Sequence, residues 1–435
     1  MITHTLLLLA LAAPGSPLVD AVSGENALHH LRAFQAIADA HGGNRAAGTP
    51  GHDASAAYVA DRLREAGYEV EMQPFTFDFY RELEPARVLS GRHVQQEVTT
   101  LAYSGSGKVR ARPQRVGRGC ADADFKRFVP RRIAVVQRGV CSFAVKTANA
   151  VQAGARAVVV VNQDGPFRGT LGKPQRVPVV GVPAKAGKRI GHAGRVTVQT
   201  KTSSETRTTH NVIAQTRAGS THDVVMVGAH LDSVLEGPGI NDNGSGSAAV
   251  LEIALQTAKF TPQRAVRFAW WGAEEEGLLG STHYVKNLSA AQRADIEVYL
   301  NLDMVASTNH IYGIYDGDDS DKMGAGPGPE GSAKVEKAFE RFYQGRGLPY
   351  RGTDFDGRSD YGPFIAAGIA AGGLFTGAEA VKTPEEAKLF GGTAGAPYDP
   401  CYHKACDDLR NVNSHVLDIN TDAVAAVVAE YAGAM

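Results

Sequence analysis

Apolar runs that alternate with helix-like segments fill the chain from His210 onward. Three apolar runs, at 224–227, 265–271 and 296–302, have the pattern of buried strands. After the turn at 241–246, apolar positions recur at helical spacing: Val250, Leu251, Ala254, Leu255 and Ala258. Alternation of strands and helices is typical of a mostly parallel sheet covered on both faces. We therefore predict an α/β fold with a mostly parallel sheet sandwiched by helices.

The N-terminal segment and the C-terminal end continue this pattern. A helix is predicted from Asn26, taken as the N-cap, to Gly42, with apolar positions at Leu28, Leu31, Phe34, Ile37 and Ala38. A second helix is expected at about 54–66, a strand at 68–75, and a last helix at about 422–432. These segments extend the same α/β layer.

Between about 85 and 204 the pattern changes to short β-branched runs, basic residues and frequent glycine. Within it, 132–137 reads as a strand, 143–155 as a helix and 157–162 as a second strand, which is one βαβ-like unit. We predict an inserted smaller, β-rich domain at 85–204, inside a main domain formed by 23–84 and 205–435. The insert has no metal-ligand or nucleophile spacing, so a lid or substrate-gathering role is the simplest expectation.

Composition narrows the function classes. With 435 residues, 43% of them hydrophobic and 21% charged, the chain can bury large cores and reads as globular. A formal net charge of −1 gives no reason to expect nucleic acid or an anionic membrane as partner.

The first residues and the cysteines bear on location. The apolar run 6–13 is too short to span a bilayer, and residues 1–22 are read as a signal peptide region, although the run lacks a basic flank. The four cysteines fall as Cys120 with Cys141 and Cys401 with Cys406. In an exported chain an even count favours two disulfides, and the two local pairings are the simplest of three. The alternative is four free buried thiols.

Candidate chemistry lies where the predicted strands end. His230, Glu274 with Glu275, and Asp303 each follow one of the three apolar runs. The carboxyl ends of parallel strands face the ligand crevice, so these groups can converge there. With Asp242 and the late His403, they would form a ligand set for a pair of divalent metal ions.

Each element also has an ordinary interpretation. His230 and Asp232 share a face, so the imidazole can bind metal while Asp232 orients the region from behind; alone, the pair is a polar loop. Asp242 can bridge two ions or simply cap a helix. Three successive acids from Glu274 to Glu276 are usually a solvated surface, but here one can hold an ion while its neighbour takes a proton from water. Only their combination favours hydrolysis at a metal centre.

Ordered motifs then identify a resemblance: AHLDS, NDNGSGSAA, WWGAEEEGL, LNLDM, GRSDYGPF, GGLFTGAE and DPCYHKACD. Over about 26–83 and from 210 to the end, the chain resembles the co-catalytic zinc aminopeptidases of peptidase family M28, close to the secreted bacterial leucine-type enzymes. The stretch RGVCSFAVKTANAVQAGA is similar to the protease-associated (PA) domain of secreted peptidases. The resemblance implies one zinc ion on His230 and Asp303, a second on Glu275 and His403, and Asp242 across both.

The same resemblance implies further roles. Glu274 becomes the general base, Tyr402 a hydroxyl donor to the oxyanion, and Glu276 a bystander, and the Asp242–Asn243 peptide is expected to be cis. Arg358 is placed near the substrate, with a structural ion pair to Asp354, Asp356 or Asp360 as the alternative. Phe375 matches a side-chain pocket that would favour Leu, Met or Phe, with core packing as its alternative.

A calcium site is only half matched. Some members of the family carry calcium, and Asp418 and Asp422, four positions apart, resemble the C-terminal part of that site. The matching N-terminal carboxylate falls at Ala21, next to Asp20.

The expected function is therefore a secreted, extracellular or periplasmic, monomeric dizinc aminopeptidase that acts on the N-termini of peptides or proteins, with no nucleic acid or membrane partner. The rivals are a carboxypeptidase with the same metal centre, a single-zinc glutaminyl cyclase, and a receptor that keeps the fold without metal. The complete set of five ligand positions argues against the last two.

Overall fold

The computed structural model of the protein describes residues 16–91, 93–95, 97–322, 324, 326–433 and 435. The chain forms two compact units, one made of the residues up to Phe75 together with Thr208–Met435, the other of Thr76–Arg207. The insert thus begins and ends a few residues outside the predicted 85–204. Each unit has its own core.

The first unit is built on a large mixed sheet. Its strands follow the order β14 (Arg351–Thr353), β13 (Gly313–Tyr315), β15 (Ala371–Phe375), β12 (Ile296–Asp303), β10 (Ser220–His230), β11 (Arg264–Trp271), β9 (Val196–Gln215), β1 (Glu69–Ser90) and β2 (His93–Val94). The central strands β15, β12, β10 and β11 are mutually parallel, as predicted. Antiparallel pairs occur beside them, β11 with β9 and β13 with β15. Strands β1 and β9 contribute residues to both units, and β2 belongs to the second.

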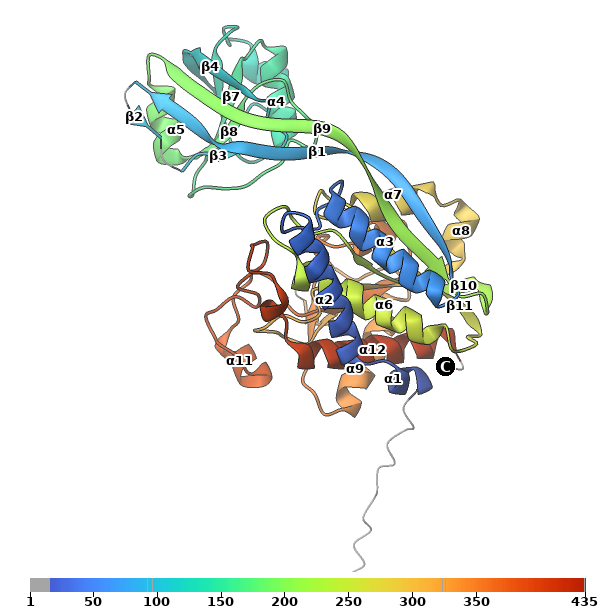
Figure 1. Ribbon diagram of the computed structural model, residues 1–435. Coiled ribbons are helices and arrows are strands. Elements are labelled where there is room, and N and C mark those ends of the chain that lie inside the picture. Colours follow the sequence, from blue (N-terminus) through green and yellow to red (C-terminus); the bar gives the residue numbers. More distant parts are fainter. Residues whose placement is uncertain (1–15, 92, 96, 323, 325, 434) are drawn as a thin grey trace, which may run out of the picture. The chain divides into compact units, whose positions relative to one another are not determined.

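Helices cover both faces of this sheet (Figure 1). Alternate residues of β10 point to opposite sides: Val225 and Val227 join one apolar core and Met226 joins the other. The first core also holds side chains of α2 (Gly24–Ala40), α3 (Pro50–Glu65), α6 (Gly246–Thr257), α9 (Ser332–Gly345) and α12 (Ser414–Ala432). The second holds side chains of α7 (Leu279–Asn287) and α10 (Tyr361–Ala366). The shorter helices are α8 (Ala290–Ala294) and α11 (Pro384–Phe390).

Helix starts differ from the prediction where local capping decides them. Helix α2 begins at Gly24, because the Ser23 hydroxyl accepts the N–H of Glu25 at 3.2 Å; Asn26 is therefore not the cap. Its side chain instead donates to Glu252 Oε1 at 3.1 Å. Helix α3 begins at Pro50, a residue suited to the first helical turn, and α12 begins at Ser414 with Asn413 as its cap.

The described chain starts with helix α1 (Pro17–Ala21), capped by Ser16. Leu18 is fully buried in the first core, and Ser16 Oγ donates to the Met435 carbonyl at 2.6 Å. The apolar run 6–13 of the expected leader lies outside the described residues, whereas 16–22 are packed into the domain. Among the helices described, none has the length and apolar character needed to cross a membrane.

The second unit has a smaller sheet with the order β3 (Thr99–Thr100), β8 (Val179–Pro183), β7 (Ala157–Asn162), β6 (Ile133–Gln137) and β5 (Pro113–Gly117). Strands β6 and β7 are parallel and connected through α4 (Phe143–Gln152), which is the predicted βαβ unit. Helix α5 (Ala184–Gly191) follows β8, and β4 (Gly107–Ala111) pairs with β9. The Cys120–Cys141 disulfide lies in this unit and confirms the predicted pairing.

Candidate metal centre

Two neighbouring parallel strands end at the site. His230 is the last residue of β10 and Asp303 the last of β12, so both side chains emerge at the same edge of the sheet. Glu274 and Glu275 follow β11 on the other side of β10. Asp242 lies in η2 (Ile240–Ser245), a kinked turn whose backbone is not helical at Asp242 and Asn243 and which leads into α6.

These side chains form two clusters that share Asp242. In the first, His230 Nε2 lies 3.4 Å from Asp242 Oδ1 and 3.4 Å from Asp303 Oδ1. In the second, His403 Nε2 lies 3.1 Å from Asp242 Oδ2 and 3.0 Å from Glu275 Oε2. In each cluster the three ligand atoms lie within 4.8 Å of one another. The two oxygens of Asp242 therefore face two separate sets of donors.

Asp232 holds the backbone behind the donor clusters through hydrogen bonds. The residue is fully buried, and its carboxylate accepts the backbone N–H of Glu274 at 3.1 Å and of Glu275 at 3.3 Å. The His230 ring is oriented by the backbone of Asp232, whose carbonyl lies 3.0 Å from Nδ1, while the Asp232 carboxylate is 3.9 Å away. A partner on Nδ1 leaves Nε2 free to face the site.

Glu274 is close to both clusters but belongs to neither. Its Oε2 lies 3.9 Å from His230 Nε2, and the residue is buried. A carboxylate at the edge of a metal centre, not used as a ligand, is suited to moving protons.

The backbone is strained around the ligands. Ala273, which precedes Glu274, Met304, which follows Asp303, and His403 itself have φ of 55°, 51° and 56°. Left-handed φ at residues other than glycine is uncommon and concentrates at functional sites. The Asp242–Asn243 peptide is cis, as the resemblance implied.

The electrostatics of the protein atoms alone favour a bound cation. Burial raises the pKa of Glu274 well above its usual range and that of Glu275 to about 7. Burial by itself would lower the pKa of His403, but Asp242 and Glu275 raise it to about 10. A bound dication would reverse both effects, because it stabilises carboxylates and requires unprotonated imidazole nitrogens.

The donor set fits zinc. Nitrogen and carboxylate oxygen are zinc ligands, and each cluster supplies three protein atoms, which leaves room for water or substrate as in catalytic sites. Glu275 Oε1 is buried and has no hydrogen-bond partner among the described residues. A buried carboxylate oxygen without a hydrogen-bond partner is suited to binding a cation.

Tyr402 and Arg358 lie together at the open side. Tyr402 stacks on the His403 ring with centroids 3.9 Å apart, and its hydroxyl accepts from Arg358 Nη2 at 3.2 Å. Arg358 forms an ion pair with Glu379 at 3.0 Å, and its backbone N–H donates to Asp356 Oδ1 at 2.9 Å. Burial raises the pKa of the Tyr402 hydroxyl, so this group stays protonated and can donate.

A small cavity of about 90 Å³ opens beside these groups. Phe375, opposite Asp303 at the end of β15, lines it and also packs on the second core, so both of its expected roles are compatible with its position. The other apolar walls are Met304, Tyr315 and Tyr361. A larger cavity of about 570 Å³, beside β1 and α7, contains none of the candidate ligands.

Several residues of the site had no predicted role. Ser359 Oγ donates to Asp303 Oδ2 at 2.5 Å and accepts from Asn301 Nδ2 at 2.9 Å. Ser359 lies in the motif GRSDYGPF and Asn301 in LNLDM, so the motifs were the sequence signal that could have identified them. Arg45 is fully buried and donates to the carbonyls of Leu231, Pro238 and Gly239, in the loop between His230 and Asp242. No local pattern marks Arg45.

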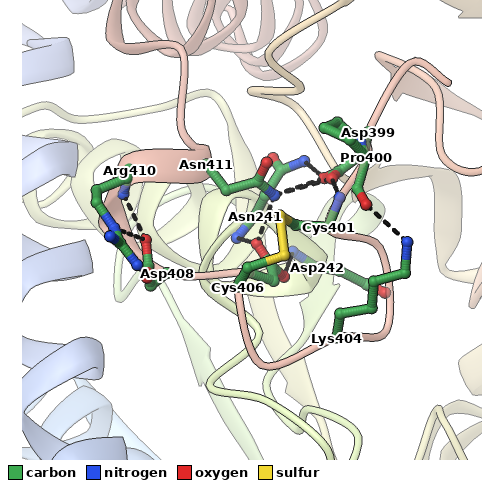
Figure 2. The surroundings of a disulfide bond; sticks show 11 residues. Asn241, Asp242, Asp399, Pro400, Cys401, Lys404, Cys406, Asp408, Arg410 and Asn411 are labelled. Atoms are coloured by element: carbon green, nitrogen blue, oxygen red, sulfur yellow. Dashed lines mark hydrogen bonds and ion pairs between the residues drawn. A yellow bond between two sulfur atoms is a disulfide. The ribbon is translucent and has the colours of Figure 1, made fainter. Parts of the chain in front are cut away.

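His403 lies in a loop closed by the Cys401–Cys406 disulfide, the second predicted pairing (Figure 2). Shortly after this loop the chain forms η3 (Leu409–Asn411). Figure 2 shows the disulfide loop directly beside Asn241 and Asp242. The expected bracing of His403 by a short disulfide loop is present.

The half-matched calcium residues have other partners. Asp418 Oδ1 accepts the N–H of Gly24 at 2.8 Å, and Asp422 pairs with Arg346 at 2.8 Å. In the part of the chain that is described, the clusters suited to a metal are the two above and one of Asp316, Asp318 and Glu336; none includes Asp418 or Asp422.

Comparison with known proteins agrees with this geometry. Residues 211–428 match peptidase family M28, and residues 106–190 match the PA domain. An aminopeptidase of Pseudomonas aeruginosa is 44% identical over 437 residues, which cover 93% of this chain and 80% of that protein. Leucine aminopeptidase 2 of Trichophyton rubrum is 40% identical, with 92% of this chain and 82% of that protein covered.

Among solved structures, a zinc aminopeptidase from Bacillus subtilis superposes with a TM-score of 0.67 at 27% identity, over 94% of this chain and 95% of that one. Its similarity extends over both units of the chain. The chain thus belongs to peptidase family M28, as the sequence motifs implied, and is a hydrolase of that family with an inserted PA domain.

Proposed function

We propose that the protein is an aminopeptidase that uses two zinc ions and Glu274 to remove N-terminal residues, preferably large and apolar ones, from peptides or proteins. The observation that carries this proposal is the placement of the Asp242 carboxylate between two donor sets. One of its oxygens faces His230 and Asp303, and the other faces His403 and Glu275. The expectation of a zinc-dependent aminopeptidase is confirmed at the level of enzyme class by the relatives.

Zinc bound in such a site polarises the substrate carbonyl and lowers the pKa of water. Glu274 accepts the proton of the attacking water and passes it to the departing amine, because its carboxylate reaches the site without being needed as a ligand. The Tyr402 hydroxyl donates to the oxyanion that develops on the carbonyl. Arg358, which donates to that hydroxyl, orients it toward the site.

Selectivity for a free N-terminus follows from the charge of the cavity. Glu274 and Asp303 line it, with Asp356 at its margin, so a substrate ammonium group gains ion pairs there. An acetylated N-terminus offers no charge to these carboxylates. We therefore expect a free α-amine to be required.

The preference for large apolar residues rests on the opposite wall. Phe375, Met304, Tyr315 and Tyr361 present apolar surface, and a cavity of about 90 Å³ has the size of one aliphatic side chain. Burial of such a side chain is favourable by about 1.5–3 kcal/mol.

The test combines a zinc assay with three substrates. The purified protein should contain two zinc ions per chain and hydrolyse Leu-p-nitroanilide, but not N-acetyl-Leu-p-nitroanilide or a peptide bond that releases a C-terminal residue. Removal of zinc by 1,10-phenanthroline should abolish the activity, and added zinc should restore it. Hydrolysis of the acetylated substrate, carboxypeptidase activity or cyclisation of an N-terminal glutamine would reject the proposal.

We also propose export from the cytoplasm and a monomeric state. Both cysteine pairs are disulfide-bonded, which suits an oxidising compartment. Because Leu18 is buried, any leader should end before Ser16. Calcium at Asp418 and Asp422 is disfavoured by the Arg346 ion pair, which already compensates one of the two charges.

A further inference from the structure

One buried residue, Asp407, holds the turn that carries the bridging carboxylate. Three successive backbone N–H groups donate to it: Ile240 to its carbonyl at 3.0 Å, Asn241 to Oδ1 at 2.9 Å and Asp242 to Oδ2 at 3.0 Å. Buried backbone N–H groups in an irregular turn need hydrogen-bond partners, and here a single residue satisfies all three. The position of Asp242 is thereby set from Asp407.

Asp407 also lies directly beside the disulfide loop of His403. It directly follows Cys406, and its backbone N–H donates to the Lys404 carbonyl at 3.0 Å. At the other end of the loop, Asp399 accepts the backbone N–H of Cys401 at 2.7 Å and the side chain of Asn241 at 2.6 Å. Figure 2 shows Asp399 between Asn241 and Cys401, with dashed lines to both.

Asn411 links the two acids. Its Nδ2 lies 2.9 Å from Asp407 Oδ1 and 2.9 Å from both oxygens of Asp399. Figure 2 shows the bonds from Asn411 to Asp399. Asp399, Asp407, Asn411 and Asn241 therefore form one hydrogen-bonded cluster that joins the loop of His403 to the turn of Asp242.

Burial of this cluster is energetically unfavourable. Asp399 and Asp407 are 1% and 2% exposed, and the buried guanidinium of Arg45 interacts electrostatically with Asp407. Burial of two neighbouring carboxylates is unfavourable unless hydrogen bonds and nearby positive charge compensate it. Ordinary packing does not call for two of them at this place.

We infer that Asp407 is a positioning residue that sets Asp242 and His403 at a fixed spacing and so determines how tightly the ion between Glu275 and His403 is held. The inference rests on the proposed dizinc centre. Two of the three protein ligands of that ion are connected to Asp407: Asp242 by a backbone hydrogen bond, and His403 through the disulfide loop that Asp407 follows. The ion at His230 and Asp303 has only Asp242 attached, so its affinity depends less on Asp407.

The test is a cobalt titration of the full-length protein after its metal has been removed with a chelator. Calorimetry and the visible absorption of Co²⁺ give one dissociation constant for each site. Asp407→Asn keeps the volume of the side chain but turns an amide N–H toward a backbone N–H. Asp408→Asn is the matched control, because Asp408 is the next acid and pairs with Arg410 away from the centre.

We expect Asp407→Asn to weaken one cobalt constant by roughly 10- to 100-fold, the usual range for groups that orient metal ligands, and the other by a smaller factor. Asp408→Asn should leave both constants unchanged. Unchanged constants in Asp407→Asn would overturn the inference. An equal loss at both sites would also overturn it, because it would mark a general structural role.

If Asp407→Asn does not fold, the titration is repeated with Asn411→Ala. This variant removes the hydrogen bonds between Asn411 and the two acids and leaves Asp407 in place. A selective loss at one site then supports the inference, and unchanged constants overturn it. A wild-type protein that binds fewer than two cobalt ions would instead reject the proposed dizinc centre, so the two failures are distinguishable.

Discussion

Replacing Glu274 by glutamine separates proton transfer from metal binding. The Glu274 carboxylate belongs to neither donor cluster, and the residue is anchored through its backbone N–H to Asp232 at 3.1 Å. Glutamine has nearly the same size and keeps that backbone bond, so the metal ligands should stay in place. What is lost is a group that can accept a proton.

The magnitude follows from the role. General base catalysis contributes about 10²–10⁴ in rate, and each factor of ten corresponds to about 1.36 kcal/mol. We therefore expect Glu274→Gln to lower kcat by about 10²–10⁴, which raises the barrier by about 3–5 kcal/mol. The zinc content should remain that of the wild type.

The assay is the initial rate with Leu-p-nitroanilide over a range of concentrations, together with zinc measured by mass spectrometry on the same preparation. Glu276→Gln, two residues further along the acidic run, is the matched control and should keep its activity. If Glu274→Gln retains kcat within a factor of ten, Glu274 is not the base. If it loses zinc instead, Glu274 is a ligand and the assignment is wrong.

Four further outcomes are expected. Arg45→Met should lower the free energy of unfolding by about 3–5 kcal/mol in urea titrations, because three carbonyls and nearby acids lose a buried cation; a loss below about 1 kcal/mol contradicts this. Tyr402→Phe should reduce kcat by about 10²–10³ with zinc retained, as for loss of one oxyanion donor; an unchanged kcat removes Tyr402 from the mechanism. Burial raises the pKa of Asp360 to about 7, so this carboxyl makes the metal-free protein less stable as pH rises from its unfolded pKa toward 7. Asp360→Asn should thus gain stability relative to the wild type between about pH 4 and pH 8 in chelator, and a difference that does not vary with pH refutes this. Replacing Cys401 and Cys406 by serine should cost about 2 kcal/mol from loop entropy, given a sequence separation of 5, and should weaken zinc binding as well; unaltered zinc affinity means that the disulfide does not brace the site.

Much of the site was accessible from the sequence because strand ends are easy to recognise. The apolar runs before His230, Glu274 and Asp303 are strands β10, β11 and β12, and parallel strands end at one edge of a sheet. The two disulfides follow from cysteine spacing in the same direct way. Asp242 and His403 entered the candidate ligand set as residue types that bind metal, since a turn residue and a late loop residue have no periodic signal, and only the resemblance assigned them to individual ions.

Of the supporting residues, Asp232 was predicted from its spacing to His230, but Arg45 and Asp407 were not predictable, because their roles arise from contacts between distant segments. Arg45 Nη2 meets the Gly239 carbonyl across 194 residues, and Asn241 meets Asp407 across 166. Hydrophobic periodicity identifies the buried face of an element but not which buried polar group it meets. The start of α2 was misplaced for a related reason: Ser23 and Asn26 are both good caps, and only their contacts distinguish them.

The central claim is that Asp242 is shared by two metal ions, and anomalous X-ray diffraction at the zinc edge tests it most directly. Our account predicts two anomalous peaks on either side of Asp242, one next to His230 and Asp303, the other next to Glu275 and His403. A single peak, or peaks that do not contact Asp242, would contradict it.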